Sequence, residues 1–265
     1  MQLKELLQHI ETFAPLSLQE EYDNAGLICG NPENKISTVL LTTDITEPVI
    51  DEAVEKGCNL IISHHPLTLK GIKNLRPDSY VQRCFIKAIQ HNINLYSAHT
   101  NMDAVKEGVS GRMAKKLGLT HCQILQPVNQ QGGAEQQEFG FGIIGDLPEP
   151  VDTLEFLNHV KEKFHCKTIR HTAISTPLIK RVALCGGAGS FLTQVAIASG
   201  ADIYITADFK YHDFFQAENK IIIADIGHYE SEQFTKEIFY ELLTKKLPTF
   251  AIQFSRVQTN PVYYL

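Results

Sequence analysis

Short runs of β-branched and other apolar residues alternate with helical patterns along most of this chain, and this alternation limits its fold most strongly. In the first half, three strand-like runs (residues 37–44, 58–66 and 93–100) each precede a segment with helical periodicity. Gly57 and Asn92 follow two of these segments, where a residue that tolerates a left-handed conformation commonly ends a helix. Such alternation is typical of βαβ units. The sequence therefore predicts an α/β protein with mostly parallel central sheets.

The alternating pattern is interrupted between residues 126 and 142 by a Gln/Gly-rich stretch that has no hydrophobic periodicity. We interpret this stretch as a loop or a connection between two lobes. After it, strand-like and helical segments resume, including a helix from about residue 151 to 164. We therefore expect two interlinked α/β lobes, the first formed by residues 1–125 with 220–265 and the second by residues 126–219.

Composition excludes several classes of protein. The longest apolar runs are far shorter than the roughly 20 residues that span a bilayer, and the amphipathic N-terminus does not resemble a secretory signal. We therefore expect a soluble, cytoplasmic protein without a membrane partner. The 24 basic and 30 acidic residues form no run of like charge, which gives no electrostatic basis for nucleic-acid binding. Six cysteines without a CxxC pair argue against a sulfur-rich zinc site.

Residue types that bind metals follow directly after three of the predicted strands. NLIIS runs into two histidines, NLYS into AHTNMD, and KIIIADI into GHYESE. Ligands of open parallel sheets bind beyond the carboxyl ends of the strands, so these residues could meet if the three strands share a sheet. The predicted metal ligands are His64, His65, Asp103, His228 and Glu232.

Each group also has a simpler interpretation. His228 and Glu232, four residues apart on a predicted helix, could share an ion or could merely stabilise the first helical turn. His64 and His65 could both reach one site because Pro66 ends the strand, or one could be packed and the other solvated. Asp103 could bind a metal, cap the following helix, or do both.

The motifs in this order resemble the Nif-three-like family, also called GTP cyclohydrolase 1 type 2 homologues. The matching segments span almost the whole chain and are EYDNAGLICG, SHHPL, SAHTNMDA, VALCGGAGS, ITADFKYHD, DIGHYESE and NPVYYL. The chain resembles the short form of the family, because residues 126–177 are too few for the large domain that longer relatives insert. Tyr22 stands where relatives often carry Trp, and Ala207 stands where Gly is usual.

The resemblance implies a dinuclear metal site in the cleft of a two-lobed subunit, and a ring-shaped homohexamer. It places the five predicted ligands on the family's metal positions, with Glu232 as the bridge. We expect His65 and Asp103 to hold one ion, and His64 and His228 to hold the other. Two divalent ions per subunit (Zn, Fe, Mn or Co) suit this nitrogen and carboxylate donor set.

Two ions that share a carboxylate suggest a metal-dependent hydrolase that acts on a small phosphorylated or nucleotide-like molecule. The alternative is a non-enzymatic, hexameric metal-binding, metal-buffering or scaffold protein. The GGAGS segment at residues 186–190 could cradle a phosphate or could form a tightly packed turn. The candidates for positioning or protonating a substrate are His99, Asp44, His212 and Thr43.

Overall fold

The computed structural model describes residues 1–128 and 138–265, and the chain divides into two compact units. The first unit is Met1–Met102 with Thr235–Pro261, and the second is Asp103–Phe234 with Val262–Leu265. These bounds differ from those of the expected lobes, because the strands at 120–127 and 222–225 pair within the sheet of the second unit. Most of the Gln/Gly-rich stretch, residues 129–137, lies outside the described residues.

The sheet of the first unit is largely parallel, as expected. Its order is β1-β4-β3-β2-β11, and only the edge strand β1 runs antiparallel to its neighbour in this sheet. The strands are β1 (Gly26–Cys29), β2 (Thr38–Thr42), β3 (Leu60–Ser63), β4 (Asn94–Ser97) and β11 (Ala251–Phe254). The parallel register aligns Thr42 with Ser63 and Ser63 with Ser97, so the three strands end side by side.

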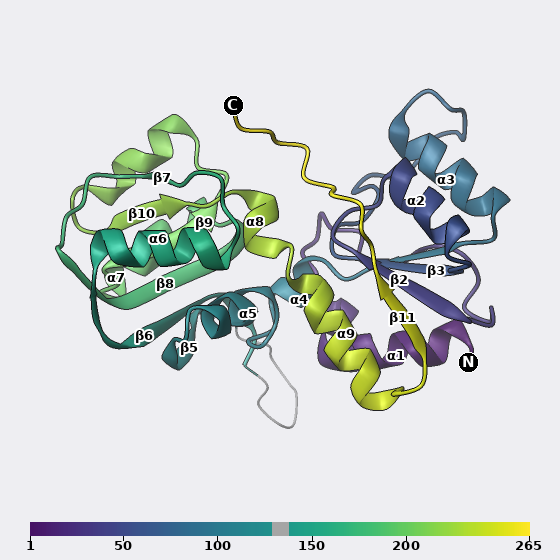
Figure 1. The fold of residues 1–265 in the computed structure, drawn as a ribbon, viewed down its shortest axis with the longest axis horizontal. Coiled ribbons are helices and arrows are strands. Elements are labelled where there is room, and N and C mark those ends of the chain that lie inside the picture. The colour runs from purple at the N-terminus through teal and green to yellow at the C-terminus, as the bar shows by residue number, and fades with distance from the viewer. Residues whose placement is uncertain (129–137) are drawn as a thin grey trace. The chain divides into compact units, whose positions relative to one another are not determined.

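Helices cover both faces of this first sheet (Figure 1). One face packs against α2 (Glu47–Glu55) and α3 (Tyr80–Gln90), and the other face is covered by α1 (Leu3–Phe13) and α9 (Thr235–Lys246). Gly57 and Asn92 follow α2 and α3 with φ values of +66° and +54°, which confirms the two predicted left-handed helix ends. The remaining short helices of this part of the chain are η1 (Leu16–Leu18) and α4 (Thr100–Asp103).

The second sheet is mixed rather than mostly parallel, which corrects the expectation for this unit. Its order is β5-β6-β8-β9-β10-β7, and only the β8–β9 and β9–β10 pairs among these are parallel. The strands are β5 (Thr120–Pro127), β6 (Gly140–Asp152), β7 (Arg170–His171), β8 (Leu178–Ala188), β9 (Ile203–Ala207) and β10 (Ile222–Asp225). Apolar runs do not reveal strand direction, because a strand buried on both faces has the same apolar pattern whether it runs parallel or antiparallel to its neighbour.

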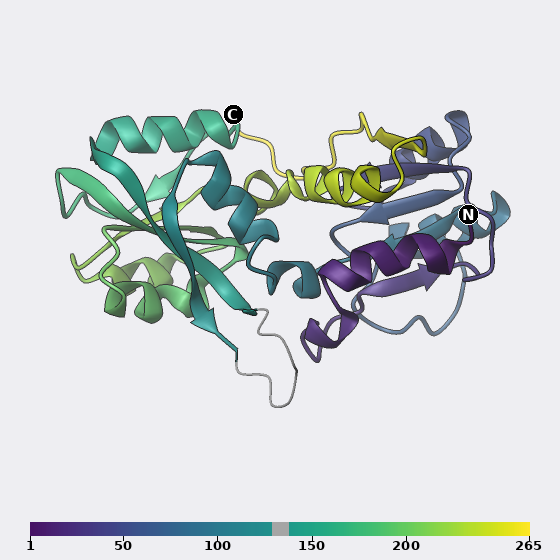
Figure 2. The same ribbon diagram turned by 90° about the horizontal axis from the view of Figure 1, so that it is seen from below.

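Helices also cover both faces of the second sheet (Figure 2). One face packs against α5 (Val109–Lys116) and α6 (Thr153–Lys163), and the other against η2 (Ser190–Leu192), α7 (Thr193–Ala198) and η3 (Tyr211–Ala217). The helical pattern of residues 227–246 forms two helices, α8 (His228–Glu232) and α9, which begins at Thr235. No helix among the described residues has the length and apolar character that a membrane crossing requires.

Candidate metal centre

Three histidines gather at the carboxyl end of the first sheet. The ring centroids of His64 and His65 are 4.8 Å apart, and that of His99 lies 5.4 Å from His64 and 5.5 Å from His65. His64 and His65 follow β3, and His99 follows the neighbouring strand β4. The rings of the two adjacent histidines therefore lie together, with His64 fully buried and 22% of the His65 side chain exposed.

The ring nitrogen Nδ1 of each adjacent histidine meets an oxygen. His64 is fully buried, and its Nδ1 lies 2.9 Å from the carbonyl oxygen of Ala98. Nδ1 of His65 lies 2.7 Å from Oδ1 of Asp44, in the loop after β2. Because a carbonyl or carboxylate oxygen accepts a hydrogen bond, Nδ1 carries the proton in each neutral ring and Nε2 is left with the lone pair.

His99 is held in the same manner, by a residue far away in the sequence. Its Nδ1 lies 2.8 Å from Oδ1 of Asp23, whose side chain is fully buried, and Oδ2 of Asp23 accepts hydrogen bonds from the amide and hydroxyl of Thr100. Burial alone would raise the pKa of Asp23, but the hydrogen bonds from His99 and Thr100 outweigh it and lower the pKa to about 2. Asp23 is therefore ionised at neutral pH.

This lowered pKa predicts an acid-dependent contribution to stability. A carboxyl group with a folded pKa of about 2 and an ordinary value of 3.8 stabilises the fold above pH 4, and the contribution disappears as the pH falls toward 2. We expect Asp23→Asn to lower the free energy of unfolding by about 2 kcal/mol at pH 6 and by about 1 kcal/mol at pH 3. Urea unfolding at both pH values measures this difference.

The control for this prediction is Asp51→Asn, which removes an exposed carboxylate that pairs with Lys87. An exposed ion pair contributes about 0.5 kcal/mol, so this variant should stay close to the wild type at both pH values. An Asp23→Asn defect that is equally large at pH 3 and pH 6 would contradict the assignment of an ionised, hydrogen-bonded Asp23.

In the second unit, His228 and Glu232 lie on one face of α8, as their spacing predicts. Nε2 of His228 is 3.0 Å from Oε2 of Glu232, and its Nδ1 is 2.8 Å from Oδ2 of Asp208, which follows β9. Burial would lower the pKa of His228, but the two carboxylates outweigh it and raise the pKa to about 11. Glu232 itself is almost completely buried, with 3% of its side chain exposed.

The glycine run at the end of β8 packs against these residues. A Cβ atom added to Gly187 would lie 2.3 Å from Oε1 of Glu232 and 3.4 Å from Cε1 of His228, and Gly187 has a φ of +64°. The amide of Gly187 donates to the hydroxyl of Ser231, and that of Gly186 donates to Ser110. Since these two amides serve internal contacts, close packing against α8 explains this part of the run better than a phosphate cradle.

Asp103 is the last residue of α4 and belongs to the second unit. It does not cap the following helix, because α5 begins at Val109 and its N-cap residue is Gly108. Burial, reinforced by the carboxylates of Asp103 and Glu232, raises the pKa of the Cys185 thiol to about 12. Both carboxylates therefore influence the same buried thiol.

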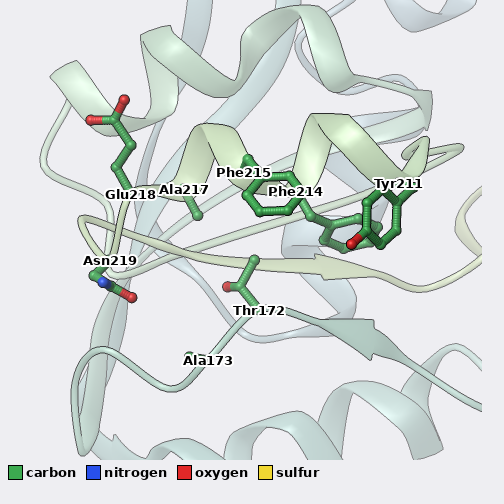
Figure 3. A pocket seen from close by; sticks show the side chains of 8 residues that line it. All are labelled: Thr172, Ala173, Tyr211, Phe214, Phe215, Ala217, Glu218 and Asn219. Carbon is green, nitrogen blue, oxygen red and sulfur yellow. The ribbon is translucent and has the colours of Figure 1, made fainter.

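His212 lies in an exposed aromatic cluster of the second unit. Its ring contacts Tyr211 and Phe215 on η3. The same helix lines a pocket of about 460 Å³, shown in Figure 3, and none of the five predicted metal ligands lines it. The lining residues are Thr172, Ala173, Tyr211, Phe214, Phe215, Ala217, Glu218 and Asn219. The structure thus places His212 in an aromatic environment.

Sequence reasoning did not identify several residues around the candidate ligands. Asp23 and Asp208 orient His99 and His228, and Thr259 donates to Asp44. Lys236 is half-buried, and burial lowers its pKa even though the negative charge of Asp44 acts to raise it. The DNAG and TADF segments of the recognised motifs contain Asp23 and Asp208, and this was the only signal that could have pointed to them.

Neither departure from the family motifs is a candidate ligand: Tyr22 is largely exposed and Ala207 is buried in β9.

Comparisons with known proteins agree with the resemblance. A Clostridium acetobutylicum protein called GTP cyclohydrolase 1 type 2 homolog is 36% identical over 233 residues, covering 88% of this chain and 85% of the relative. A Campylobacter jejuni protein with the same name is 34% identical over 267 residues, and the match covers 100% of this chain and 100% of the relative. This end-to-end match identifies the short form of the family.

Solved structures and a family model extend this similarity to the whole chain. The crystal structure of Staphylococcus aureus protein SA1388 matches with a TM-score of 0.89 at 28% identity, covering 100% of this chain and 99% of that one. The model of the Duf34/NIF3 (NGG1p interacting factor 3) family matches residues 1–261. From its motifs, its fold and these matches, the chain belongs to the Duf34/NIF3 family.

Proposed function

We propose that this protein binds two divalent metal ions through His64, His65, Asp103, His228 and Glu232, and that it is a metal-dependent hydrolase. The substrate class that we propose is a small phosphorylated or nucleotide-like molecule. In this proposal His65 and Asp103 bind one ion, His64 and His228 bind the other, and Glu232 bridges them.

The orientation of the three proposed histidine ligands is the observation that carries the proposal. Nδ1 of His64, His65 and His228 lies 2.9, 2.7 and 2.8 Å from an oxygen of Ala98, Asp44 and Asp208, respectively. Metal-ligating histidines characteristically engage their second ring nitrogen in this way, which fixes the tautomer and the direction of the ligand nitrogen.

The donor set also fits the ions. His64, His65 and Glu232 are a group of side chains that could hold a metal ion. Imidazole nitrogens and carboxylate oxygens suit Zn, Fe, Mn or Co, and no thiolate belongs to the set. Gly187 has no side chain, so the Glu232 carboxylate can occupy a position that the Cβ atom of any other residue would block.

When bound, two such ions supply Lewis acidity toward water and toward the oxygens of a substrate. His99 has its Nδ1 held by the ionised Asp23, and we assign its Nε2 the transfer of a proton to or from the substrate. Asp44 is engaged with His65, so we assign it to orienting that ring rather than to contacting substrate. The nucleotide-like substrate class rests on the names of the two relatives.

Metal analysis of the purified protein tests the proposal first. Wild type purified without chelator should carry about two equivalents of a transition metal, and His65→Ala and Glu232→Ala should lose most of it. Matched controls are His91→Ala and Glu155→Ala, which remove exposed side chains of the same types. A folded wild type that holds no metal, and takes up none on reloading, would overturn the proposal.

A second experiment separates the hydrolase from the non-enzymatic alternative, a homohexameric metal-binding or scaffold protein. A hydrolase should lose turnover of phosphoesters or nucleotides in Glu232→Gln while its assembly is unchanged. A structural site should instead lose assembly or thermal stability when the metal is stripped. Light scattering and calorimetry before and after metal removal, beside a turnover screen, distinguish the two.

A further inference from the structure

The segment that follows β11 is anchored against the first sheet near the candidate ligands. The buried carboxylate of Glu52, on α2, accepts hydrogen bonds from the hydroxyl of Ser255 at 2.5 Å and from the amide of Arg256 at 2.9 Å. The amide of Ser255 also donates to the carbonyl of Leu41, which continues the pairing of β11 with β2. The beginning of this segment, at Ser255 and Arg256, is therefore held in place by partly buried polar contacts.

Further along this segment, Thr259 contacts the carboxylate that orients His65. Its hydroxyl donates to Oδ2 of Asp44 at 2.5 Å, while Oδ1 of Asp44 lies 2.7 Å from Nδ1 of His65. The two oxygens of one carboxylate thus have different partners, one on each side. Because a carboxylate rotates about its Cβ–Cγ bond, a single hydrogen bond to His65 would leave its orientation weakly restrained, and the second bond restrains it further.

We infer that Thr259 is a positioning residue, which fixes the tautomer and the direction of the His65 ring through Asp44. This inference rests on the proposed function, because it assigns the C-terminal segment a role in a ligand of the proposed metal site. The simpler alternative is that the hydroxyl of Thr259 only attaches residues 255–259 to the fold. That role would change stability but would not change which nitrogen of His65 carries the proton.

Three variants in the full-length protein test the inference. Thr259→Val keeps the shape of the side chain and removes the hydroxyl, Thr259→Ser keeps the hydroxyl, and Thr244→Val is the matched control. Thr244 also donates its hydroxyl within the first unit, to the carbonyl of Tyr240, with no connection to Asp44. The readouts are the ¹⁵N signals of the His65 ring in metal-free protein, the affinity for Zn²⁺ by competition with a chelator, and the thermal midpoint.

We expect Thr259→Val to show a mixture of His65 tautomers and to bind Zn²⁺ about tenfold more weakly, the lower end of the range for residues that support a ligand. Thr259→Ser should restore both properties, and Thr244→Val should change neither. If Thr259→Val matches Thr244→Val in tautomer and affinity, or changes only the thermal midpoint, the inference is wrong. Thr259→Ala provides the same readouts if the valine variant does not fold.

The experiment also separates this inference from the proposed function. A wild type that binds no Zn²⁺ defeats the proposed metal site, and the tautomer of His65 in metal-free protein then decides the role of Thr259 alone. A wild type that binds Zn²⁺ normally, with an unchanged His65 ring in Thr259→Val, defeats the role of Thr259 and leaves the metal site intact.

Discussion

Replacing Gly187 by alanine should weaken metal binding by about 100-fold or more while leaving the second unit folded. The added Cβ would lie 2.3 Å from Oε1 of Glu232, which cannot stay where it is. The contact is with the end of a side chain rather than with backbone, so the carboxylate can move and the fold can survive. A displaced carboxylate can no longer act as the proposed bridge. Chelator competition with Zn²⁺ measures the loss.

The control for this variant is Gly200→Ala. Gly200 has a similar φ of +72°, but an added Cβ would meet no heavy atom within 4 Å. Both variants bear the strain of a left-handed alanine, about 1 kcal/mol, and only Gly187→Ala displaces Glu232. Wild-type Zn²⁺ affinity in Gly187→Ala would show that Glu232 is not a ligand or that it keeps its place.

A second readout for Gly187→Ala does not depend on metal. Burial lowers the pKa of His228, while Glu232 and Asp208 together raise it to about 11. If the Glu232 carboxylate moves away, the imidazolium loses a stabilising charge, and its pKa should fall toward the ordinary value of 6.5. NMR titration of the ring in metal-free protein checks this directly, with Gly200→Ala as the reference.

Asp225→Ala should destabilise the second unit by about 2 to 4 kcal/mol, because two backbone amides would lose their acceptor. Asp225 ends β10 with 4% of its residue surface exposed, and Oδ2 accepts hydrogen bonds from the amide of Phe209 and the guanidinium of Arg170. Its Oδ1 accepts from the amide of Gly227 at 3.1 Å. Alanine would leave all three donors without this partner and would loosen the two loops that hold Asp208 and His228.

The matched control is Asp202→Ala. Asp202 also accepts two backbone hydrogen bonds, from Lys180 and Arg181, but it is only partly buried, so water can replace it. We expect that variant to lose about 1 to 2 kcal/mol. Native-state hydrogen exchange of the β8, β9 and β10 amides measures the stability of this unit by itself. Equal losses in the two variants would show that burial of Asp225 adds nothing.

The local features of this protein were predictable from its sequence. His228 and Glu232 are four residues apart, and α8 brings Nε2 and Oε2 to within 3.0 Å. Apolar strands that end at histidines predicted where β3 and β4 would stop, and Gly57 and Asn92 correctly indicated two helix ends. These predictions succeed because helical spacing, strand burial and left-handed conformations depend on neighbours in the chain.

Partners that are distant in the sequence were decided by the tertiary structure alone. Asp23 meets His99 across 76 positions, and Thr259 meets Asp44 across 215. The tertiary structure also decided the directions of the strands in the second sheet and the close approach of Gly187 to Glu232. The sequence by itself determined the α/β elements and the residue types at the strand ends. Which acceptor holds each histidine required the folded chain, because hydrogen bonds over such separations follow from packing and not from local sequence.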